Sequence, residues 1–156
     1  MSHREETGEL DLARSLLDWS AVWMRRSLHG LNRYTRAAGL SLAQMNVLMH
    51  LHYSGSCEVM DLTELMQASP AAASQMVERM VQQGLARRAE SADDRRVRRV
   101  QLSAQGRKRV EEYIAGQQKE MEALAASLTA EQRAAVALAL RVLAEKAELW
   151  EGTASG

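Results

Sequence analysis

The sequence predicts a mainly α-helical fold that carries one small β-hairpin. Apolar residues recur at steps of three or four over most of the 156-residue chain, and the chain contains a single proline. Only in residues 85–102 does the apolar spacing shorten to about two residues, which is typical of strands. The length predicts one domain, and the balance of apolar and charged residues is that of an ordinary globular protein.

The first predicted helix runs from about residue 10 to residue 38 and ends at Gly39. One apolar stripe contains Leu12 and Leu16, and a second contains Leu17. A helix with two apolar stripes must contact two surfaces, so this helix is expected to pack against more than its own domain.

Two shorter helices follow. Ser41 opens the first of them, because Ser41 and Gln44 have the spacing of a capping box. The next helix is expected over residues 59–66, and either Glu58 or Asp61 could cap it. The sequence does not decide which of these two residues is the cap.

A fourth helix is predicted over residues 70–83. Ser69 is its N-cap and Pro70 its first residue, a combination that favours a helix start, and Gly84 ends it. Small residues at its beginning, Ala71 and Ala72, would allow another molecule to approach the backbone closely. On its outer side lie polar residues that could reach the edges of bases or the phosphates of DNA, namely Ser74, Gln75 and Arg79.

The predicted hairpin consists of strands at residues 85–90 and 97–102 that flank a polar tip. Val97, Val100 and Leu102 alternate with polar residues, which indicates a packed strand rather than a solvated charge cluster. A helix, a turn, a second capped helix and a basic hairpin follow one another in the order of a winged helix-turn-helix.

The two C-terminal helices are each expected to begin at a capping residue. Ser103 opens one that runs to about residue 127, and Thr129 with Gln132 opens the last, over residues 130–150. The last helix is apolar on nearly all sides, which is typical of a buried helix. Because too little chain remains to cover it, we expect a second copy of the protein to do so.

Positive charge is concentrated around the hairpin. The formal net charge is zero, yet residues 87–109 hold nine basic and three acidic residues. This local excess favours a nucleic acid partner and argues against binding by the whole surface.

Several classes of protein are not expected. Cys57 is the single cysteine, so no disulfide can form within the chain, and no apolar segment has the length of a signal or membrane span. We therefore expect a soluble, cytoplasmic protein without a membrane partner. No catalytic motif or cofactor site stands out, and His50 and His52 lie on different helix faces, which disfavours a metal site. A role of Cys57 as a thiol sensor is the weaker alternative to a structural role.

Three spaced motifs resemble the MarR family of bacterial transcription regulators: Gly84-Leu85-Ala86-Arg87, Asp94-Arg95-Arg96 and Leu102-Ser103-Ala104-Gln105-Gly106. The resemblance covers about residues 10–150, although the family often has a longer, β-branched residue at the position of Ala86. It implies a homodimer with a dimerisation region at residues 10–38 and 103–150 and a winged helix-turn-helix DNA-binding domain at residues 41–102.

The resemblance also implies roles for the wing. Arg96 would enter the minor groove and Asp94 would orient it, whereas Arg95, Arg98 and Arg99 would mainly contact phosphates. Two wings and two recognition helices would then bind a near-palindromic operator. The complete set of residues expected at DNA is Ser69, Ala71, Ala72, Ser74, Gln75, Arg79, Arg87, Asp94, Arg95, Arg96, Arg98 and Arg99.

Members of the family also respond to small phenolic or lipophilic molecules. The candidate lining residues in this chain are Trp19, Trp23, His29, Met49, His50 and Tyr53, with core or dimer packing as the competing interpretation of the two tryptophans. The leading hypothesis is a ligand-responsive, dimeric regulator that acts as a repressor. The alternative is a protein-interaction adaptor that retains the fold without specific DNA binding.

Overall fold

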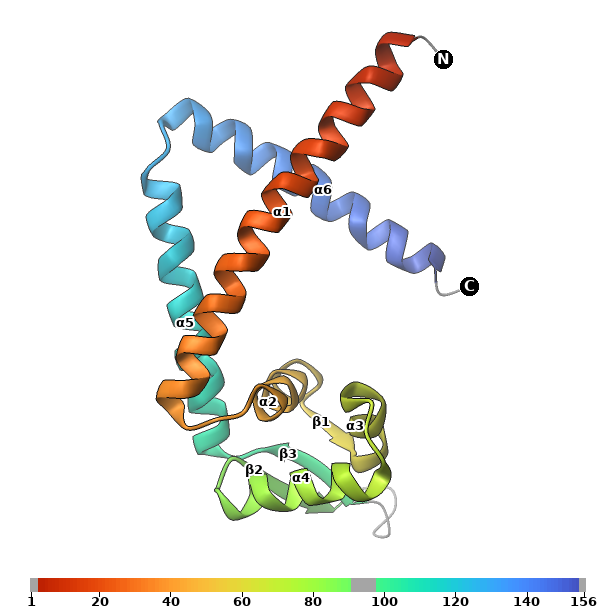
Figure 1. Ribbon diagram of the computed structural model, residues 1–156, viewed down its shortest axis with the longest axis vertical. Helices are drawn as coiled ribbons and strands as arrows, with labels where there is room; N and C mark the ends of the chain where they lie inside the picture. The colour runs from red at the N-terminus through yellow and green to blue at the C-terminus, as the bar shows by residue number, and fades with distance from the viewer. Residues whose placement is uncertain (1–2, 91–97, 155–156) are drawn as a thin grey trace. The chain divides into compact units, whose positions relative to one another are not determined.

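The computed structural model describes residues 3–90 and 98–154, and these residues form a mainly α-helical fold with a small sheet (Figure 1). The fold class predicted from the sequence is therefore confirmed. In chain order, the elements are α1 (His3–Ala38), α2 (Leu42–Ser54), β1 (Ser56–Glu58), α3 (Val59–Met66), α4 (Pro70–Gln82), β2 (Ala86–Glu90), β3 (Arg98–Leu102), α5 (Ala104–Ala126) and α6 (Ala130–Ala154).

The chain divides into two compact units, residues 1–115 and residues 116–156. The boundary lies inside α5, so the first unit holds α1 to α4, the sheet and the beginning of α5. The second unit holds the end of α5 and all of α6. The functional division into residues 41–102 and a dimerisation region stays a prediction.

Helix α1 begins at His3, about two turns before the predicted start at residue 10. The additional turns contain Glu5, Glu6 and Glu9, which are good helix formers and suit the positive end of the helix dipole. Apolar periodicity could not predict these first two turns of α1, because they contain no stripe of apolar residues. The helix ends as predicted at Gly39, whose φ is +68°.

The start of α2 has the predicted capping box. The Ser41 hydroxyl accepts a hydrogen bond from the Gln44 backbone N–H at 3.1 Å, and Gln44 Oε1 accepts one from the Ser41 N–H at 2.8 Å. The structure also decides between the two candidate caps of α3. Glu58 is the N-cap, and the Asp61 carboxylate accepts a hydrogen bond from its backbone N–H at 2.8 Å.

The sheet has three antiparallel strands in the order β1-β3-β2, so the prediction of a two-stranded hairpin was incomplete. Strands β2 and β3 pair as predicted, with Ala86 opposite Leu102. Strand β1 pairs with the other edge of β3, where Cys57 lies opposite Val100. It has only three residues within a serine-rich stop, which is too short for an alternating pattern to be recognised.

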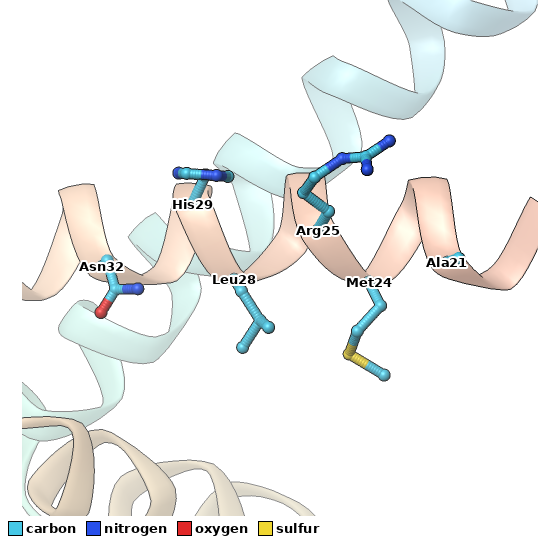
Figure 2. Close-up of a pocket in the computed structure, with 6 residues that line it drawn as sticks. All are labelled: Ala21, Met24, Arg25, Leu28, His29 and Asn32. Carbon is cyan, nitrogen blue, oxygen red and sulfur yellow. The ribbon is translucent and has the colours of Figure 1, made fainter.

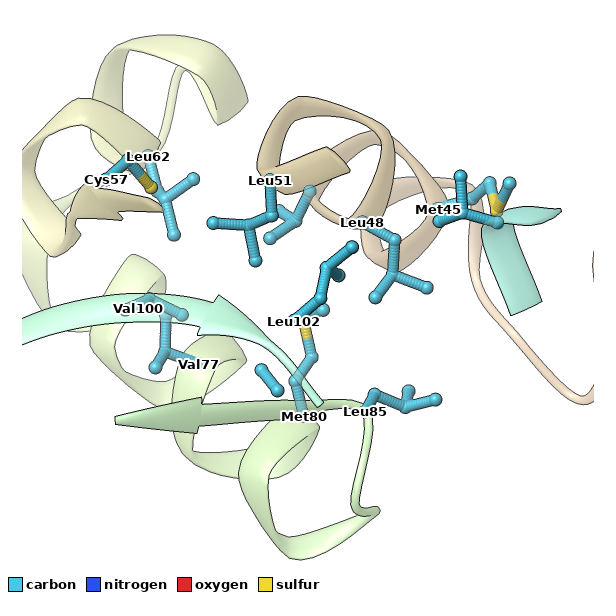
Figure 3. Packing of buried hydrophobic residues seen from close by; sticks show 13 residues of the cluster. Met45, Leu48, Leu51, Cys57, Leu62, Val77, Met80, Leu85, Val100 and Leu102 are labelled. Carbon is cyan, nitrogen blue, oxygen red and sulfur yellow. The ribbon is translucent and has the colours of Figure 1, made fainter. Parts of the chain in front are cut away.

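The hydrophobic core lies between α2, α4 and the sheet (Figure 3). Met45, Leu48 and Leu51 of α2 are buried, and Val100 and Leu102 of β3 belong to the same cluster. The burial of these two residues confirms a packed strand over Arg98–Leu102, whereas Val97, which was also predicted to pack, lies outside the described residues. The other buried members of the core cluster are Val47, Cys57, Leu62, Val77, Met80, Leu85, Ala86 and Val110.

Helix α4 ends in a tight turn that directs the chain into β2. The Leu85 N–H donates to the Met80 carbonyl at 2.8 Å, and the Gly84 N–H donates to the Val81 carbonyl at 2.9 Å. These two bonds form a Schellman motif, for which Gly84 supplies a φ of +70°. The predicted role of Gly84 at the end of the helix is confirmed.

Helix α5 begins at the predicted cap and contacts this same turn. The Ser103 hydroxyl accepts a hydrogen bond from the Gly106 N–H at 2.9 Å and donates one to the Gly84 carbonyl. The Leu85 carbonyl accepts from the Ser103 N–H at 3.2 Å. The start of α5 is therefore fastened to the end of α4.

In the second unit, α6 begins with the predicted capping box. The Thr129 N–H donates a hydrogen bond to Gln132 Oε1 at 2.9 Å. Within residues 130–147, every residue but the half-buried Leu143 is exposed in the single chain. These exposed residues include Val136, Leu138, Leu140 and Val142. Among the described helices, none combines the length and apolar character that a membrane crossing requires.

Candidate nucleic-acid interface

Helix α4 separates its buried and exposed residues into two faces. Ala73, Val77 and Met80 are completely buried against the core. The opposite face is polar or small, and it includes every α4 residue that the sequence assigned to DNA contact. The cap and the predicted contact residues of this face are all exposed: Ser69, Ala71, Ala72, Ser74, Gln75 and Arg79.

The backbone N–H groups at the N-terminus of α4 already have part of their hydrogen-bonding capacity used within the protein. The Ser69 hydroxyl accepts a hydrogen bond from the Ala72 N–H at 3.2 Å, and Pro70 has no N–H to offer. Fewer backbone amides are therefore available to a phosphate than at an uncapped helix start.

An ion pair joins the exposed face of α4 to β2. Arg88 Nη2 lies 2.9 Å from Glu78 Oε2, and both side chains are partly exposed. Exposed pairs contribute little to stability. Beside DNA, however, the pair offsets the charge of a carboxylate that would otherwise repel phosphates. This pair could not be predicted from the sequence, because its members are ten residues apart and meet only when β2 folds beside α4.

The wing residues are described only in part. Asp94, Arg95 and Arg96 lie outside the described residues. Arg98 begins β3, and its backbone pairs with that of Glu90, but its side chain is also outside the description. Arg87 is exposed on β2.

Arg99 differs from Arg87 because its side chain is half-buried. One terminal nitrogen, Nη2, lies 3.5 Å from the Ser56 carbonyl oxygen of β1. Its Nε is buried and has no hydrogen-bond partner within the described part of the chain. The two arginines therefore occupy different environments, although the sequence grouped both with the DNA contacts.

A buried amide fixes the other end of α4. Gln44 of α2 is 7% exposed, and its Nε2 donates to Gln83 Oε1 at 2.6 Å, just after the last residue of α4. The sequence identified Gln44 only as a capping residue. The side chain therefore has two functions, since its Oε1 closes the capping box while its Nε2 holds the end of α4.

One of the six candidate effector-binding residues, His29, lies at open hollows along α1, and the set as a whole stays a prediction. His29 lines two open hollows along α1, one with Asn32, Arg33 and Arg36 and the other with Met24, Leu28 and their neighbours. Figure 2 shows the second hollow, where Met24 and Leu28 point to one side of the helix and Arg25 and His29 to the other. All residues that line these two hollows belong to α1.

The other five candidates lie outside these hollows. The rings of Trp19 and Trp23 stack on each other with centroids 6.3 Å apart, and Trp19 is exposed in the single chain. On α2, Met49 and His50 are half-buried and Tyr53 is exposed.

Cys57 lies in the core and is 3% exposed. Burial, reinforced by the Asp61 carboxylate, raises the pKa of its thiol to about 11. Reactive cysteines have a lowered pKa and solvent access, so this environment favours a structural role over a thiol sensor. Within the described residues, no group of three or more His, Cys, Asp or Glu side chains could hold a metal ion.

Comparison with known proteins relates the whole architecture to one family. The model of the MarR family matches residues 38–97. The HTH-type transcriptional repressor MdtR of Bacillus subtilis is 34% identical over 110 residues, which span 70% of this chain and 71% of MdtR. The relative that the chain matches over most of its length is thus a transcription regulator.

Solved structures agree with this relationship. The YusO protein from Bacillus subtilis is 26% identical, with a TM-score of 0.61 over 93% of this chain and 99% of YusO. A mutant of MepR from S. aureus, bound to an oligodeoxyribonucleotide, is 15% identical, with a TM-score of 0.64 over 84% of this chain and 96% of MepR. At that identity the likeness shows the fold alone, and it confirms the predicted winged helix-turn-helix.

Proposed function

Because this chain belongs to the MarR family of DNA-binding transcription regulators, we propose that it is a homodimeric, ligand-responsive repressor of a near-palindromic operator. The observation that carries this proposal is the exposed polar face of α4, beside a hairpin in the most basic part of the chain. A nucleic acid partner requires both a shape that enters a groove and positive charge around it.

Helix α4 is the proposed recognition helix. Its buried face leaves only polar or small side chains outward, and the major groove, about 12 Å wide, admits a helix of this kind. Gln75 and Arg79 have the chemistry to bind base edges or phosphates, whereas Ala71 and Ala72 permit close approach. MepR, which has this fold, was solved with an oligodeoxyribonucleotide, and this supports the assignment of DNA as partner.

The hairpin between β2 and β3 is the proposed wing. We assign Arg96 to the minor groove with Asp94 orienting it, and Arg95 and Arg98 to phosphates, on the basis of the family resemblance. Arg87 is exposed on β2 and is assigned to the phosphate backbone as well. Phosphate contacts supply affinity that declines with salt, and base contacts supply sequence preference.

A homodimer accounts for the apolar residues that the single chain leaves exposed. On α1, Leu10 is 72% exposed and Leu17 is 69% exposed, and on α6, Leu138 is 59% exposed. Apolar surface of this extent is typical of an interface between protein chains. Two-fold symmetry would present two α4 helices to two half-sites, hence the near-palindromic operator.

Repression and ligand response extend the proposal to regulation. MdtR, a relative with 34% identity, is named as a repressor, and this supports repression rather than activation. The hollows at His29 on α1 combine basic and apolar side chains, as a lipophilic anion would require. Such a molecule would favour a dimer whose recognition helices no longer match the operator spacing.

The test is the salt dependence of binding to duplex DNA selected from a random library. We expect specific binding whose affinity falls steeply with salt, because phosphate neutralisation releases counterions. A duplex of scrambled sequence is the control. If the protein does not bind duplex DNA even at low salt, the adaptor alternative replaces the proposal.

A further inference from the structure

Arg99 occupies the middle strand of the sheet. In β3 it lies opposite Glu58 of β1 on one side and opposite Ala89 of β2 on the other. Its side chain is half-buried, whereas Arg87 of the neighbouring strand is exposed. A phosphate contact needs a guanidinium that reaches beyond the surface, so the burial of Arg99 is unexpected for such a role.

The guanidinium of Arg99 is directed at the backbone of β1. Its Nη2 lies 3.5 Å from the Ser56 carbonyl oxygen, which is a long hydrogen bond, and its Nε is withdrawn from solvent without a partner among the described residues. Burying a cationic donor is unfavourable unless nearby groups compensate. The surroundings of Arg99 must therefore supply favourable electrostatics.

An acidic residue lies beside Arg99 in the sheet, since Glu58, the N-cap of α3, is directly opposite it in the register of β1 and β3. The charges of Arg99 and Asp61 both act on the Cys57 thiol, with opposite effects on its pKa. Asp61 also accepts the Glu58 N–H at 2.8 Å, which fixes its carboxylate at the junction of β1 and α3. The register of the sheet and the contact with Ser56 therefore place Arg99 beside the junction of β1 and α3.

We propose that Arg99 is a positioning residue that holds the β2–β3 hairpin against β1 and the start of α3, and that it does not neutralise a DNA phosphate. This inference rests on the proposed function, and it replaces the phosphate role that the family resemblance implies for Arg99. Because β3 is the only bridge between β1 and β2 in the described sheet, the residue controls the angle at which the hairpin leaves the domain.

The first test measures operator affinity against salt concentration for wild-type protein and the variants Arg99→Ala, Arg99→Lys and Arg87→Ala. A lost phosphate contact lowers the salt slope by about one, and we expect this for Arg87→Ala. Arg99→Ala should weaken binding with an unchanged slope. Arg99→Lys should remain as weak, because lysine keeps the charge and the aliphatic stem but lacks the planar fork of donors.

Two outcomes overturn the proposal: a slope reduced by about one in Arg99→Ala, or wild-type affinity in Arg99→Lys. If Arg99→Ala does not fold, the operator affinity of Arg99→Lys tests the proposal by itself, and wild-type affinity overturns it. If the wild-type protein binds no specific duplex, the proposed function itself is overturned. That result is distinct from the two outcomes that overturn the role of Arg99.

The second test distinguishes positioning from a general loss of structure. Hydroxyl-radical footprinting with Arg99→Ala should lose the protection beneath the hairpin and keep the protection beneath α4. Melting should show that the variant is folded under these conditions. Equal loss of both protected regions from a folded variant would overturn the positioning role.

Discussion

Gly106 and Leu85 approach each other more closely than any larger residue at position 106 would permit. A Cβ placed on Gly106 would lie 1.9 Å from the Leu85 carbonyl oxygen and 3.3 Å from a methyl group of Leu48. The first turn of α5 therefore packs directly on the backbone that links α4 to β2. This contact gives a physical reason for the glycine in the motif Leu102-Ser103-Ala104-Gln105-Gly106.

We expect Gly106→Ala to destabilise the protein by several kcal/mol, on the order of a severe core substitution, because backbone atoms cannot yield as a flexible side chain can. The matched control is Gly116→Ala in the same helix, where an added Cβ meets nothing within 4 Å. That change should stabilise the helix by up to about 1 kcal/mol. Urea unfolding measures both, and equal effects of the two substitutions would contradict the packing that we describe.

The Glu78–Arg88 pair leads to a prediction about DNA affinity. Arg88→Ala should weaken DNA binding severalfold, because it removes the positive charge that compensates the Glu78 carboxylate on the exposed face of α4. The double variant Glu78→Ala with Arg88→Ala should bind more tightly than Arg88→Ala alone. Stability should change by no more than about 1 kcal/mol in either variant, since the pair is partly exposed. A double variant that binds as weakly as the single one would show that Arg88 itself contacts DNA.

Arg96→Ala should weaken binding to the selected operator by roughly 1–3 kcal/mol, as expected for a contact that reads sequence. Its effect on a scrambled duplex should be smaller. Arg95→Ala is the matched control, and it should weaken both duplexes similarly and reduce the salt slope. Unchanged operator affinity in an Arg96→Ala titration would remove this residue from the minor-groove role.

Cys57 should react slowly in the folded protein. A pKa of about 11, against 9.0 for an unperturbed thiol, lowers the thiolate fraction at pH 8 about a hundredfold, and burial excludes the reagent as well. Modification by a thiol reagent should therefore be slow in buffer and rapid in urea. Rapid modification of the folded protein would restore the sensor hypothesis.

The same thiol affects stability at alkaline pH. The folded state binds the Cys57 proton more tightly than the unfolded state, so its contribution is fully present below pH 9 and declines as pH rises towards 11. The raised pKa of Tyr34, caused first by burial and then by its hydrogen bond to Glu112, acts in the same direction at higher pH. In Cys57→Ala, unfolding measurements should show a smaller decline across this range.

The dimer can be tested by mass. Light scattering at micromolar concentration should give twice the chain mass of 17.4 kDa. Leu138→Glu should shift the protein towards the monomer, because it places a charge among the exposed apolar residues of α6. Lys146→Glu, at an exposed polar position of the same helix, should leave the mass unchanged. A monomeric wild-type protein would contradict the homodimer.

The elements that could be predicted from the sequence are those whose determinants are local. Ser41 with Gln44, Ser69 with Pro70, and Thr129 with Gln132 all identify helix starts within four residues of sequence, and each start is observed. Local patterns also predicted β2 and β3, because Val100 and Leu102 alternate with polar residues and a polar segment separates the two strands in the sequence.

The features that the sequence did not reveal depend on long-range pairing. Strand β1 is defined by its partner β3, and the Gln44–Gln83 contact joins residues 39 positions apart. The exposed face of α4 followed from helical periodicity, but the partial burial of Arg99 depends on two neighbouring strands. An arginine in an alternating strand is ordinarily assigned to the solvent side, so its position in the middle of the sheet had to come from the structure.

The contact between Gln44 and Gln83 has a consequence for how a signal could cross the first unit. The Leu40 N–H donates to the Thr35 carbonyl at 2.8 Å at the end of α1, and Ser41 follows directly and shares its capping box with Gln44. Gln44 in turn holds Gln83 at 2.6 Å. The last turn of α1 is therefore joined to the end of the proposed recognition helix by a short series of hydrogen bonds, separate from the apolar contacts that Val77 and Met80 make in the core.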